Sequence, residues 1–400
     1  MSPPATIDRV VLRNYRSIAE CDVALGRLTW LVGRNGAGKS NFLDALHFVR
    51  DALNGSLDRA VEERGGFGSV LRRSGGHPNR FDVRLEFTLP DGRRGVYGFG
   101  VTSRKGSVPL VSHEAMDLRA GSSEPFFTIE AGELTSSSEN TRPILSDESL
   151  GLVQMAGLAA FHPAHEMLAG MSFHNFDPSS MREFRRPDSG RSMKPGGSNI
   201  ASALAYLREV DSDGYRFVQD YLNVIAPMIV GVDRIRTNGM EALEFSQAVP
   251  DAERPWSFDA HAMSDGTLRA LGILVALVHP GAHGRLYPVG IEEPEAALHP
   301  AAVAALREAI RAASEKRQLL LTTHGTDLLD DTDMDPDELR AVAWDRGRTR
   351  IVAIDDVAAR AMRNHMYSAG ELLRQEQLVP HELAAWNIDR TRDEPSGSGA

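Results

Sequence analysis

Residues 33–40 read GRNGAGKS, which has the spacing G-x-x-x-x-G-K-S of a phosphate-binding loop. The stretch before it, RLTWLV at 27–32, is short and apolar and predicts a strand. The stretch after it, NFLDALHFVRDAL at 41–53, carries its large apolar residues at helical spacing. An ordinary glycine turn before a helix needs neither this spacing nor both flanks. The order strand, glycine loop, helix therefore predicts a nucleotide-phosphate site within an α/β fold.

The backbone N–H groups of such a loop approach phosphates closely, and the N-terminus of the following helix adds positive potential. We expect Lys39 to reach the β- and γ-phosphates of ATP and Ser40 to bind Mg²⁺, so ATP and Mg²⁺ are the predicted cofactors. The residues of this segment that are predicted to bind the nucleotide are Gly33, Asn35, Gly36, Gly38, Lys39, Ser40 and Asn41.

A second motif, IEEPEAALHP at 291–300, places two carboxylates directly after the apolar run LYPVGI. Adjacent like charges beside hydrophobic residues are costly to bury, so they need a reason. Near a phosphate loop, one carboxylate can hold the shell of Mg²⁺ while its neighbour orients or deprotonates the attacking water. We predict Glu292 on the metal side, with Ser40, and Glu293 as the general base. The alternative is a solvated acidic turn at a helix start, which is common in itself.

Two further stretches help to decide which class of nucleotide-binding protein this chain represents. MSDGTLRALGILVAL at 263–277 is a polar glycine turn that opens an apolar helix, and Ser264 or Asp265 could cap it. QLLLTTHGTDLLD at 318–330 is an apolar strand that ends in Thr-Thr-His. Taken singly, a capped helix and a histidine at a strand end are the commoner meanings.

Taken in order, GRNGAGKS, SDGTLR, IEEPEAALHP and LLLTTHGTDLL resemble the motifs of ABC-type ATPases of the SMC/RecF/OLD group, where OLD stands for overcoming-lysogenization-defect. The chain is most similar to the short single-chain ATPases of that group, which are described as AAA-family proteins. LRNYRSI, NFDPSSMRE and SAGELLRQEQL also look like that family. The resemblance spans nearly the whole chain except residues 101–150.

The resemblance implies roles for residues outside the phosphate loop. SDGTLR stands at the place of the ABC signature, so Ser264 and Gly266 would touch the γ-phosphate bound by a partner subunit. Residues 296–299 would form the D-loop at the subunit seam. His324 would be the switch histidine that senses the γ-phosphate, which makes Lys39, Glu293 and His324 the predicted catalytic set.

Two departures from the family pattern stand out. Glu292 replaces the usual Walker B aspartate and would still serve if it contacts the metal through water. The Q-loop glutamine has no clear position, and Gln154 is only a candidate for it. The resemblance also suggests that Asn14 and Arg16 border the nucleotide.

The predicted fold class is α/β, a P-loop NTPase of the ABC/OLD type with a mixed sheet and a helical insertion. Within it we expect a hairpin at 80–102, loop or edge structure at 119–148 and a strand pair at 340–354. The expected parts are an N-terminal ATPase lobe at 1–165, a helical insertion at 166–257, a C-terminal ATPase lobe at 258–365, and a C-terminal helix with a disordered tail at 366–400.

Composition bears on the partners of the protein and on its place in the cell. The 400 residues carry a net charge of −11, so a DNA surface would have to be a local basic patch, such as 72–80 or 181–194. A solvated loop is the commoner meaning of such basic stretches. Cys21 is the single cysteine, no signal peptide is evident, and no apolar run approaches the ~20 residues of a spanning helix. We therefore expect a cytoplasmic protein without a membrane partner.

These features predict an ATP-hydrolysing homodimer with ATP sandwiched between subunits. We expect it to control a separate effector, a nuclease, in prokaryotic anti-phage defence or DNA repair. The alternative is a transporter-type ABC ATPase subunit coupled to a membrane partner. Only 76 residues follow His324, too few for the Toprim nuclease domain of OLD proteins. His162, His165 and His174 match no zinc-binding spacing.

Overall fold

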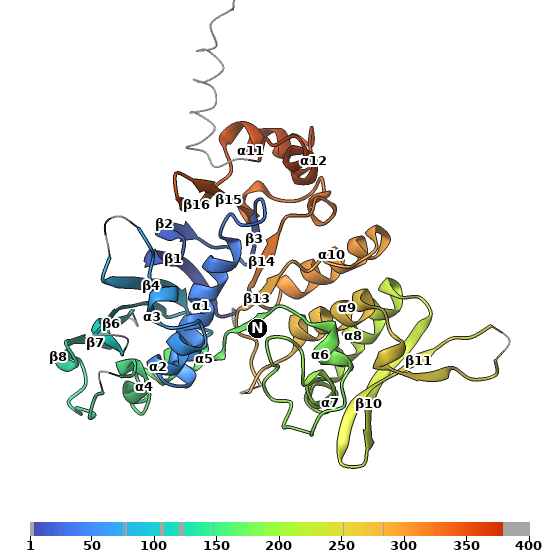
Figure 1. Cartoon of the computed structure of the whole chain (residues 1–400), viewed down its shortest axis with the longest axis horizontal. Helices are drawn as coiled ribbons and strands as arrows, with labels where there is room; N and C mark the ends of the chain where they lie inside the picture. Colours follow the sequence, from blue (N-terminus) through green and yellow to red (C-terminus); the bar gives the residue numbers. More distant parts are fainter. Residues whose placement is uncertain are drawn as a thin grey trace, which may run out of the picture.

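The structure is a computed structural model that describes residues 4–378, except 75, 77, 105–107, 120–123, 147, 251 and 283. Three β-sheets form its framework, and helices pack between and around them (Figure 1). The tail that the sequence predicts to be disordered begins after 378 and lies outside the described residues.

A six-stranded mixed sheet forms the centre of the molecule, in the order β16-β15-β3-β14-β13-β9. Four neighbours, β3, β14, β13 and β9, run parallel, β15 runs parallel to β3, and only β16 is antiparallel to its partner. The strands are short, buried and apolar, as expected where both faces of a parallel sheet are covered. Their bounds are Leu28–Val32 for β3, Leu319–Thr323 for β14, Val289–Glu292 for β13, Ser172–His174 for β9, Leu339–Asp345 for β15 and Arg348–Ala353 for β16.

The carboxyl ends of these parallel strands lie along one edge of the sheet. In the pairing register, Glu292 of β13 stands opposite Thr322 of β14, and Thr323 stands opposite Val32 of β3. The segments that follow β13, β14 and β3 therefore emerge side by side, which is where open α/β sheets place their ligands.

A seven-stranded antiparallel sheet lies beside the central sheet, in the order β2-β1-β4-β5-β6-β7-β8. Helix α1 (Lys39–Asn54) packs on it through rings of Phe48, Tyr15 and Phe81. β4 and β5 are the predicted hairpin, and β7 and β8 show that the segment 119–148 supplies the edge of this sheet. The strands are β1 Thr6–Tyr15, β2 Ile18–Ala24, β4 Arg80–Thr88, β5 Arg94–Ser103, β6 Pro109–Arg119, β7 Phe126–Glu130 and β8 Glu133–Ser137.

The segment 166–257, predicted to be a helical insertion, is only partly helical. The strand β9 within it belongs to the central sheet, and its last part forms a three-stranded antiparallel sheet on the far side of the molecule from β6–β8 (Figure 1). Asn238 and Gly239 both have positive φ and join β10 to β11 in a two-residue turn, for which Asn-Gly is the preferred sequence. The elements are α5 His162–Gly170, α6 Pro178–Arg182, α7 Ile200–Val210, α8 Ser212–Ile225, β10 Ile229–Thr237, β11 Met240–Gln247 and β12 Trp256–Asp259.

The last helix, α12 (Ala369–Arg374), is fastened to the loop that follows β14. Ser368 Oγ donates to Asp330 Oδ1 at 2.7 Å, and Arg374 forms an ion pair with the same carboxylate at 2.8 Å. A Cβ atom at Gly370 would lie 2.5 Å from the carbonyl oxygen of Thr326, so only glycine allows this approach. The remaining α-helices are α2 Leu57–Glu62, α3 Phe67–Val70, α4 Gly151–Met155, α9 Asp265–Val278, α10 Pro300–Ser314 and α11 Asp356–Arg363.

No helix among the described residues combines the length and apolarity needed to cross a membrane.

Candidate nucleotide-binding site

The glycine loop between β3 and α1 lies against the β15–β16 pair, and this closeness explains two of its glycines. A Cβ atom at Gly33 would lie 2.0 Å from the carbonyl oxygen of Val342. At Gly38, whose φ is +105°, a Cβ atom would lie 2.1 Å from Oγ1 of Thr349. Gly36 also adopts a positive φ, +77°. The loop therefore needs glycine for both its backbone conformation and its packing.

Lys39 lies inside this loop with its side chain folded back over the backbone. Its Nζ donates to the carbonyl oxygens of Gly33 at 2.7 Å and Arg34 at 3.1 Å, and the residue is only 5% exposed. Burial lowers the pKa of Lys39, and the nearby carboxylates, Glu293 first, oppose that change. A buried ammonium held by carbonyls near several carboxylates suits an anionic ligand carrying a divalent cation.

Asn41 contacts a neighbouring turn through a short chain of hydrogen bonds. Its Nδ2 donates to Ser17 Oγ at 2.6 Å, and Ser17 Oγ lies 2.7 Å from Thr349 Oγ1. Thr349 Oγ1 in turn donates to the carbonyl oxygen of Ala37 at 2.8 Å. The β1–β2 turn and β16 thus hold the middle of the glycine loop in place.

The two carboxylates after β13 make separate contacts. Ser40 Oγ donates to Glu292 Oε2 at 2.6 Å, which brings together the pair predicted to hold Mg²⁺. Glu293 has φ +45°, unusual for a residue with a side chain, and its N–H donates to the carbonyl oxygen of Thr322 at 3.0 Å. Its Oε1 lies 3.1 Å from Nδ1 of His324, and both side chains remain partly exposed. The backbone turn aims Glu293 away from Glu292, so the two carboxylates face different partners.

A third carboxylate, Glu295, contributes a contact that the sequence analysis missed. Its Oε1 accepts hydrogen bonds from Thr323 Oγ1 at 2.5 Å and from the Gly325 N–H at 3.1 Å. Its Oε2 is buried and has no hydrogen-bond partner. Glu295 therefore ties the turn after β13 to the loop that carries His324. The only signal in the sequence is a third glutamate two residues beyond the pair.

The turn at 263–266 caps α9 and touches the predicted D-loop of the same chain. Ser264 is the cap, because its Oγ accepts from the Thr267 N–H at 3.1 Å. A Cβ atom at Gly266 would lie 2.5 Å from the carbonyl oxygen of Ala297. In the described part of the chain, no hydrogen bond or ion pair links Ser264 or Gly266 to residues 33–41.

Arg269, one turn further along α9, links this helix to the turn after β13. Its Nη1 donates to the carbonyl oxygen of Phe176 at 2.7 Å, and its Nη2 lies 3.5 Å from the carbonyl oxygen of Glu293. The sequence analysis gave Arg269 no role. These contacts join α9 to the backbone of Glu293 within one subunit.

Gln154, the Q-loop candidate, lies away from the glycine loop, whereas Arg16 lies on the β1–β2 turn that contacts it. Gln154 sits on α4, where its Nε2 donates to Ser149 Oγ at 2.8 Å, and no described contact brings it to the glycine loop. At the sheet edge that carries Glu292 and Glu293, the residue that follows β9 is not a glutamine but the exposed Asn175. Arg16 pairs with Asp44 of α1 at 2.9 Å, and Asn14 has φ +55° just before it.

The predicted basic patch is largely paired with carboxylates. Arg182 donates to Asp265 at 2.5 Å, and Arg185 lies 3.3 Å from Glu183. Lys194 lies 3.8 Å from Asp188, while Arg186 is exposed. In the other basic stretch, Arg72 and Arg73 donate to the carbonyl oxygens of Gly347 and Gly68. Among the described residues of these two stretches, most cationic side chains therefore have a carboxylate or carbonyl partner.

Trp344 lines two hollows, one of which is also lined by the glycine loop. One, of about 410 Å³, is lined by the β1–β2 turn, Arg72, Arg73 and Trp344. The other, of about 780 Å³, is lined by residues 33–37, His324, Trp344 and α12. Trp344 is 54% exposed, which leaves a large aromatic side chain beside the loop.

The chain belongs to the family described as "AAA domain, putative AbiEii toxin, Type IV TA system", whose model matches residues 28–165 and 196–330. No curated protein sequence matches this chain. Among solved structures, the Smc head bound to the C-winged helix domain of ScpA covers 88% of this chain and 99% of its own, with 15% identity and a TM-score of 0.56. The Pyrococcus furiosus Smc head domain with an extended coiled coil, bound to the C-terminal domain of ScpA, covers 90% and 99%, with 12% identity and a TM-score of 0.54.

These similarities define the class of protein. The fold is the α/β fold of ABC-type P-loop ATPases as found in SMC heads, which confirms the predicted fold class and the predicted family resemblance. At 12–15% identity the solved structures show the fold alone.

Proposed function

We propose that this protein binds and hydrolyses ATP with Mg²⁺, and acts as a dimeric switch that controls a separate effector protein. The observation that carries the proposal is the assembly of five side chains at one sheet edge. Lys39 occupies the glycine loop, Ser40 contacts Glu292, and Glu293 contacts His324. Each group comes from the end of a parallel strand or the start of α1.

The groups present fit Mg²⁺-ATP. Gly33, Gly36 and Gly38 leave the loop backbone free to approach phosphates, and Lys39 supplies the positive charge. Ser40 and Glu292 would hold Mg²⁺, which neutralises phosphate charge when bound. The 2.6 Å contact between them supports a metal-side role for a glutamate where the family pattern has aspartate.

Glu293 is the proposed general base. Its partly exposed carboxylate can accept a proton from water, and His324 holds it in position through the 3.1 Å contact. The strained backbone of Glu293 supports this assignment, because such conformations persist where function requires them. His324 would face the γ-phosphate.

We place the second half of each site on a partner subunit. Ser264 and Gly266 make no described contact with the glycine loop of their own chain, and the α9 N-terminus that they open is suited to an anion. In a homodimer, this turn would close over ATP held by the partner. The D-loop segment 296–299, which touches Gly266, would lie at the same seam.

Two findings support an effector that is a separate protein. The family description names a toxin of a type IV toxin–antitoxin system, and the similar Smc heads were solved bound to ScpA. Both support a function exerted through a second protein. We propose a nuclease as the effector, in anti-phage defence or DNA repair, with DNA as a possible ligand of the complex.

The test uses the purified full chain. We expect Mg²⁺-dependent ATP hydrolysis by the wild-type protein and by Glu315→Gln, a control at an exposed glutamate outside the site. Linear, circular and single-stranded DNA should remain uncut with Mg²⁺ or Mn²⁺. Absence of ATP turnover by the well-folded wild-type protein would contradict the ATPase assignment. DNA cleavage that co-purifies with the chain and survives Lys39→Ala would contradict the separate effector.

A further inference from the structure

A cavity of about 270 Å³, distinct from the two hollows that Trp344 lines, lies at the edge of the central sheet opposite the glycine loop. Ser172 at the start of β9, Tyr287 just before β13 and Arg317 just before β14 all line it. Helices α1 and α9 begin at the nucleotide edge, and their last turns, with Arg50 and His279, also line the cavity. Its rim includes exposed residues, so it opens to solvent.

The lining is strongly enriched in nitrogen-bearing side chains. Among the described residues, Glu166 is the only carboxylate that lines the cavity, and it is already engaged by Tyr287 Oη at 2.8 Å and by Arg285 at 3.6 Å. The arginines and histidines that line it are Arg50, Arg285, Arg317, His162, His165, His174 and His279.

Arg317 brings a buried positive charge to this cavity. It is 3% exposed and makes no ion pair within the described residues. Its guanidinium donates to the carbonyl oxygens of Tyr287, Ala276 and His279, which include the last carbonyls of α9. Burial lowers its pKa to about 9. Helix-end carbonyls offset part of the cost of a buried charge, but a counter-ion would offset more.

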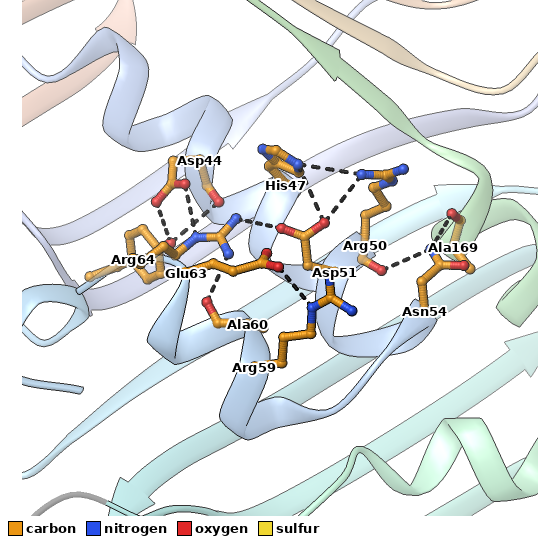
Figure 2. Close-up of polar contacts among 11 residues, drawn as sticks. Asp44, His47, Arg50, Asp51, Asn54, Arg59, Ala60, Glu63, Arg64 and Ala169 are labelled. Atoms are coloured by element: carbon orange, nitrogen blue, oxygen red, sulfur yellow. Dashed lines mark hydrogen bonds and ion pairs between the residues drawn. The ribbon is translucent and has the colours of Figure 1, made fainter. Parts of the chain in front are cut away.

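The positive charge of Arg50 is also only partly balanced by neighbouring carboxylates. Its Nη1 lies 3.2 Å from Asp51, but Arg64 holds the other oxygen of that carboxylate at 2.9 Å (Figure 2). One aspartate therefore serves two arginines here. Arg64 also pairs with Asp44 at 2.9 Å, whereas Nε of Arg50 is buried and has no hydrogen-bond partner.

His174 supplies another buried polar atom without a partner. The residue is 3% exposed, and although the ring has a hydrogen bond to the Lys194 backbone, its Nδ1 has no hydrogen-bond partner among the described residues. Burial, with Arg317 as the next cause, lowers the pKa of His174 to about 3, so the ring is neutral. Buried polar atoms are nearly always satisfied, and two unsatisfied ones on residues that line one cavity indicate a missing polar ligand.

We propose that this cavity binds a small oxyanion, with the phosphate group as the chemistry it recognises. The negative charge would balance Arg317 and Arg50, and the oxygens would accept hydrogen bonds from arginine N–H groups. A phosphate O–H would donate to Nδ1 of the neutral His174 ring, whose N–H is used by the Lys194 backbone. The volume exceeds that of several water molecules, so inorganic phosphate fits, as does a compact organic phosphate. The site is separate from the glycine loop, which lies at the opposite sheet edge.

Calorimetric titration with inorganic phosphate tests this in the Lys39→Ala background, which removes phosphate binding at the glycine loop. Binding should persist there. Arg285→Gln, at the exposed rim, should weaken binding by about tenfold through loss of one charged contact. Ala282→Trp, also at the rim, should abolish it by filling the cavity mouth. Arg216→Gln, exposed on α8 outside the cavity lining, is the matched control and should bind as the parent does.

A second measurement follows the imidazole of His174 directly by ¹⁵N NMR, and phosphate should shift its signal in the Lys39→Ala protein. Glycerol phosphate in parallel distinguishes free phosphate from an organic phosphate as the preferred ligand. If phosphate, sulfate and glycerol phosphate all fail to bind the folded Lys39→Ala protein, the cavity holds only water and the proposal is wrong. If neither Arg285→Gln nor Ala282→Trp changes the affinity for phosphate, the anion binds outside this cavity, and the proposal is again wrong.

Discussion

Nδ1 of His324 lies 3.1 Å from Oε1 of Glu293, although the two residues follow different strands. The parallel pairing of β13 with β14 creates this contact, because it brings the two strand ends side by side. Glu295 stabilises it by accepting hydrogen bonds from Thr323 and Gly325, on either side of the histidine. Glu293, Glu295 and His324 thus belong to one connected unit.

Lys39→Ala should abolish ATP binding. Lys39 is the cation enclosed by the glycine loop, and its loss leaves the phosphate charge uncompensated there. Binding of a fluorescent ATP analogue measures the effect. Lys316→Ala, at an exposed lysine, is the control and should bind normally. Unchanged affinity in folded Lys39→Ala protein would exclude this loop as the phosphate site.

Glu293→Gln should retain ATP binding and lose turnover by about a hundredfold or more, because an amide cannot accept the proton. The ATP-bound dimer should then accumulate, which light scattering coupled to gel filtration can detect. His324→Ala should also slow turnover, since it removes the partner that holds Glu293. Normal hydrolysis by Glu293→Gln would rule out Glu293 as the base.

Mixing two inactive subunits tests the composite site. Lys39→Ala disables the loop, and Ser264→Asp, which can still cap α9, places a carboxylate where the γ-phosphate of the partner's ATP should lie. A dimer of one of each contains one site with both halves intact, so the mixture should recover hydrolysis. Fluorescently labelled subunits would establish that the two forms pair. A mixture that pairs and yet stays inactive would contradict the placement of the signature turn in trans.

Glu295→Ala should lower both stability and turnover. It removes the carboxylate oxygen that accepts from both Thr323 Oγ1 and the Gly325 N–H, and leaves these groups only their hydrogen bonds to each other. The expected cost is about 1–3 kcal/mol in the free energy of unfolding, because the lost hydrogen bonds go to a charged group. Urea unfolding and steady-state ATP hydrolysis measure the two effects. Glu295→Gln keeps one acceptor oxygen, so its stability and turnover should lie between those of Glu295→Ala and wild type. The control Glu315→Ala should have the stability and turnover of wild type. Full turnover by Glu295→Ala would show that the His324 loop needs no such support.

Glu114 should make stability depend on pH. This fully buried carboxyl accepts from the N–H groups of Gly151 and Leu152 and from Tyr97 Oη. Burial nevertheless raises its pKa from 4.5 to about 7. Between these values the folded protein binds more protons than the unfolded chain, so the free energy of unfolding should fall as pH rises. Urea unfolding at several pH values should show this slope in wild type and a flatter one in Glu114→Gln.

The nucleotide site could be predicted from the sequence because each of its parts is a short contiguous motif. The glycine loop, the paired glutamates and the Thr-Thr-His strand end each stand directly after an apolar strand, and strand order then brings them together. Local sequence therefore carried most of the information about this edge.

Contacts between distant segments were harder to foresee. The helical interpretation of 229–259 overlooked the Asn238-Gly239 turn, although the strands on either side form a hairpin around it. β9 has only three residues and pairs with β13 far along the chain, so no local pattern marks it. No local pattern marks the contacts of Arg269 either, because its partners are the backbone carbonyls of Phe176 and Glu293.

The attachment of α12 to the loop after His324 offers an optical reporter of the catalytic cycle. Because Ser368 and Arg374 both hold Asp330, a displacement of that loop must be transmitted to the last helix. Gln375 follows the last residue of this helix and is exposed, so a dye attached there would sense the displacement at the rim of the hollow that α12 shares with the glycine loop. Individual turnovers could then be watched as changes in fluorescence on single immobilised dimers.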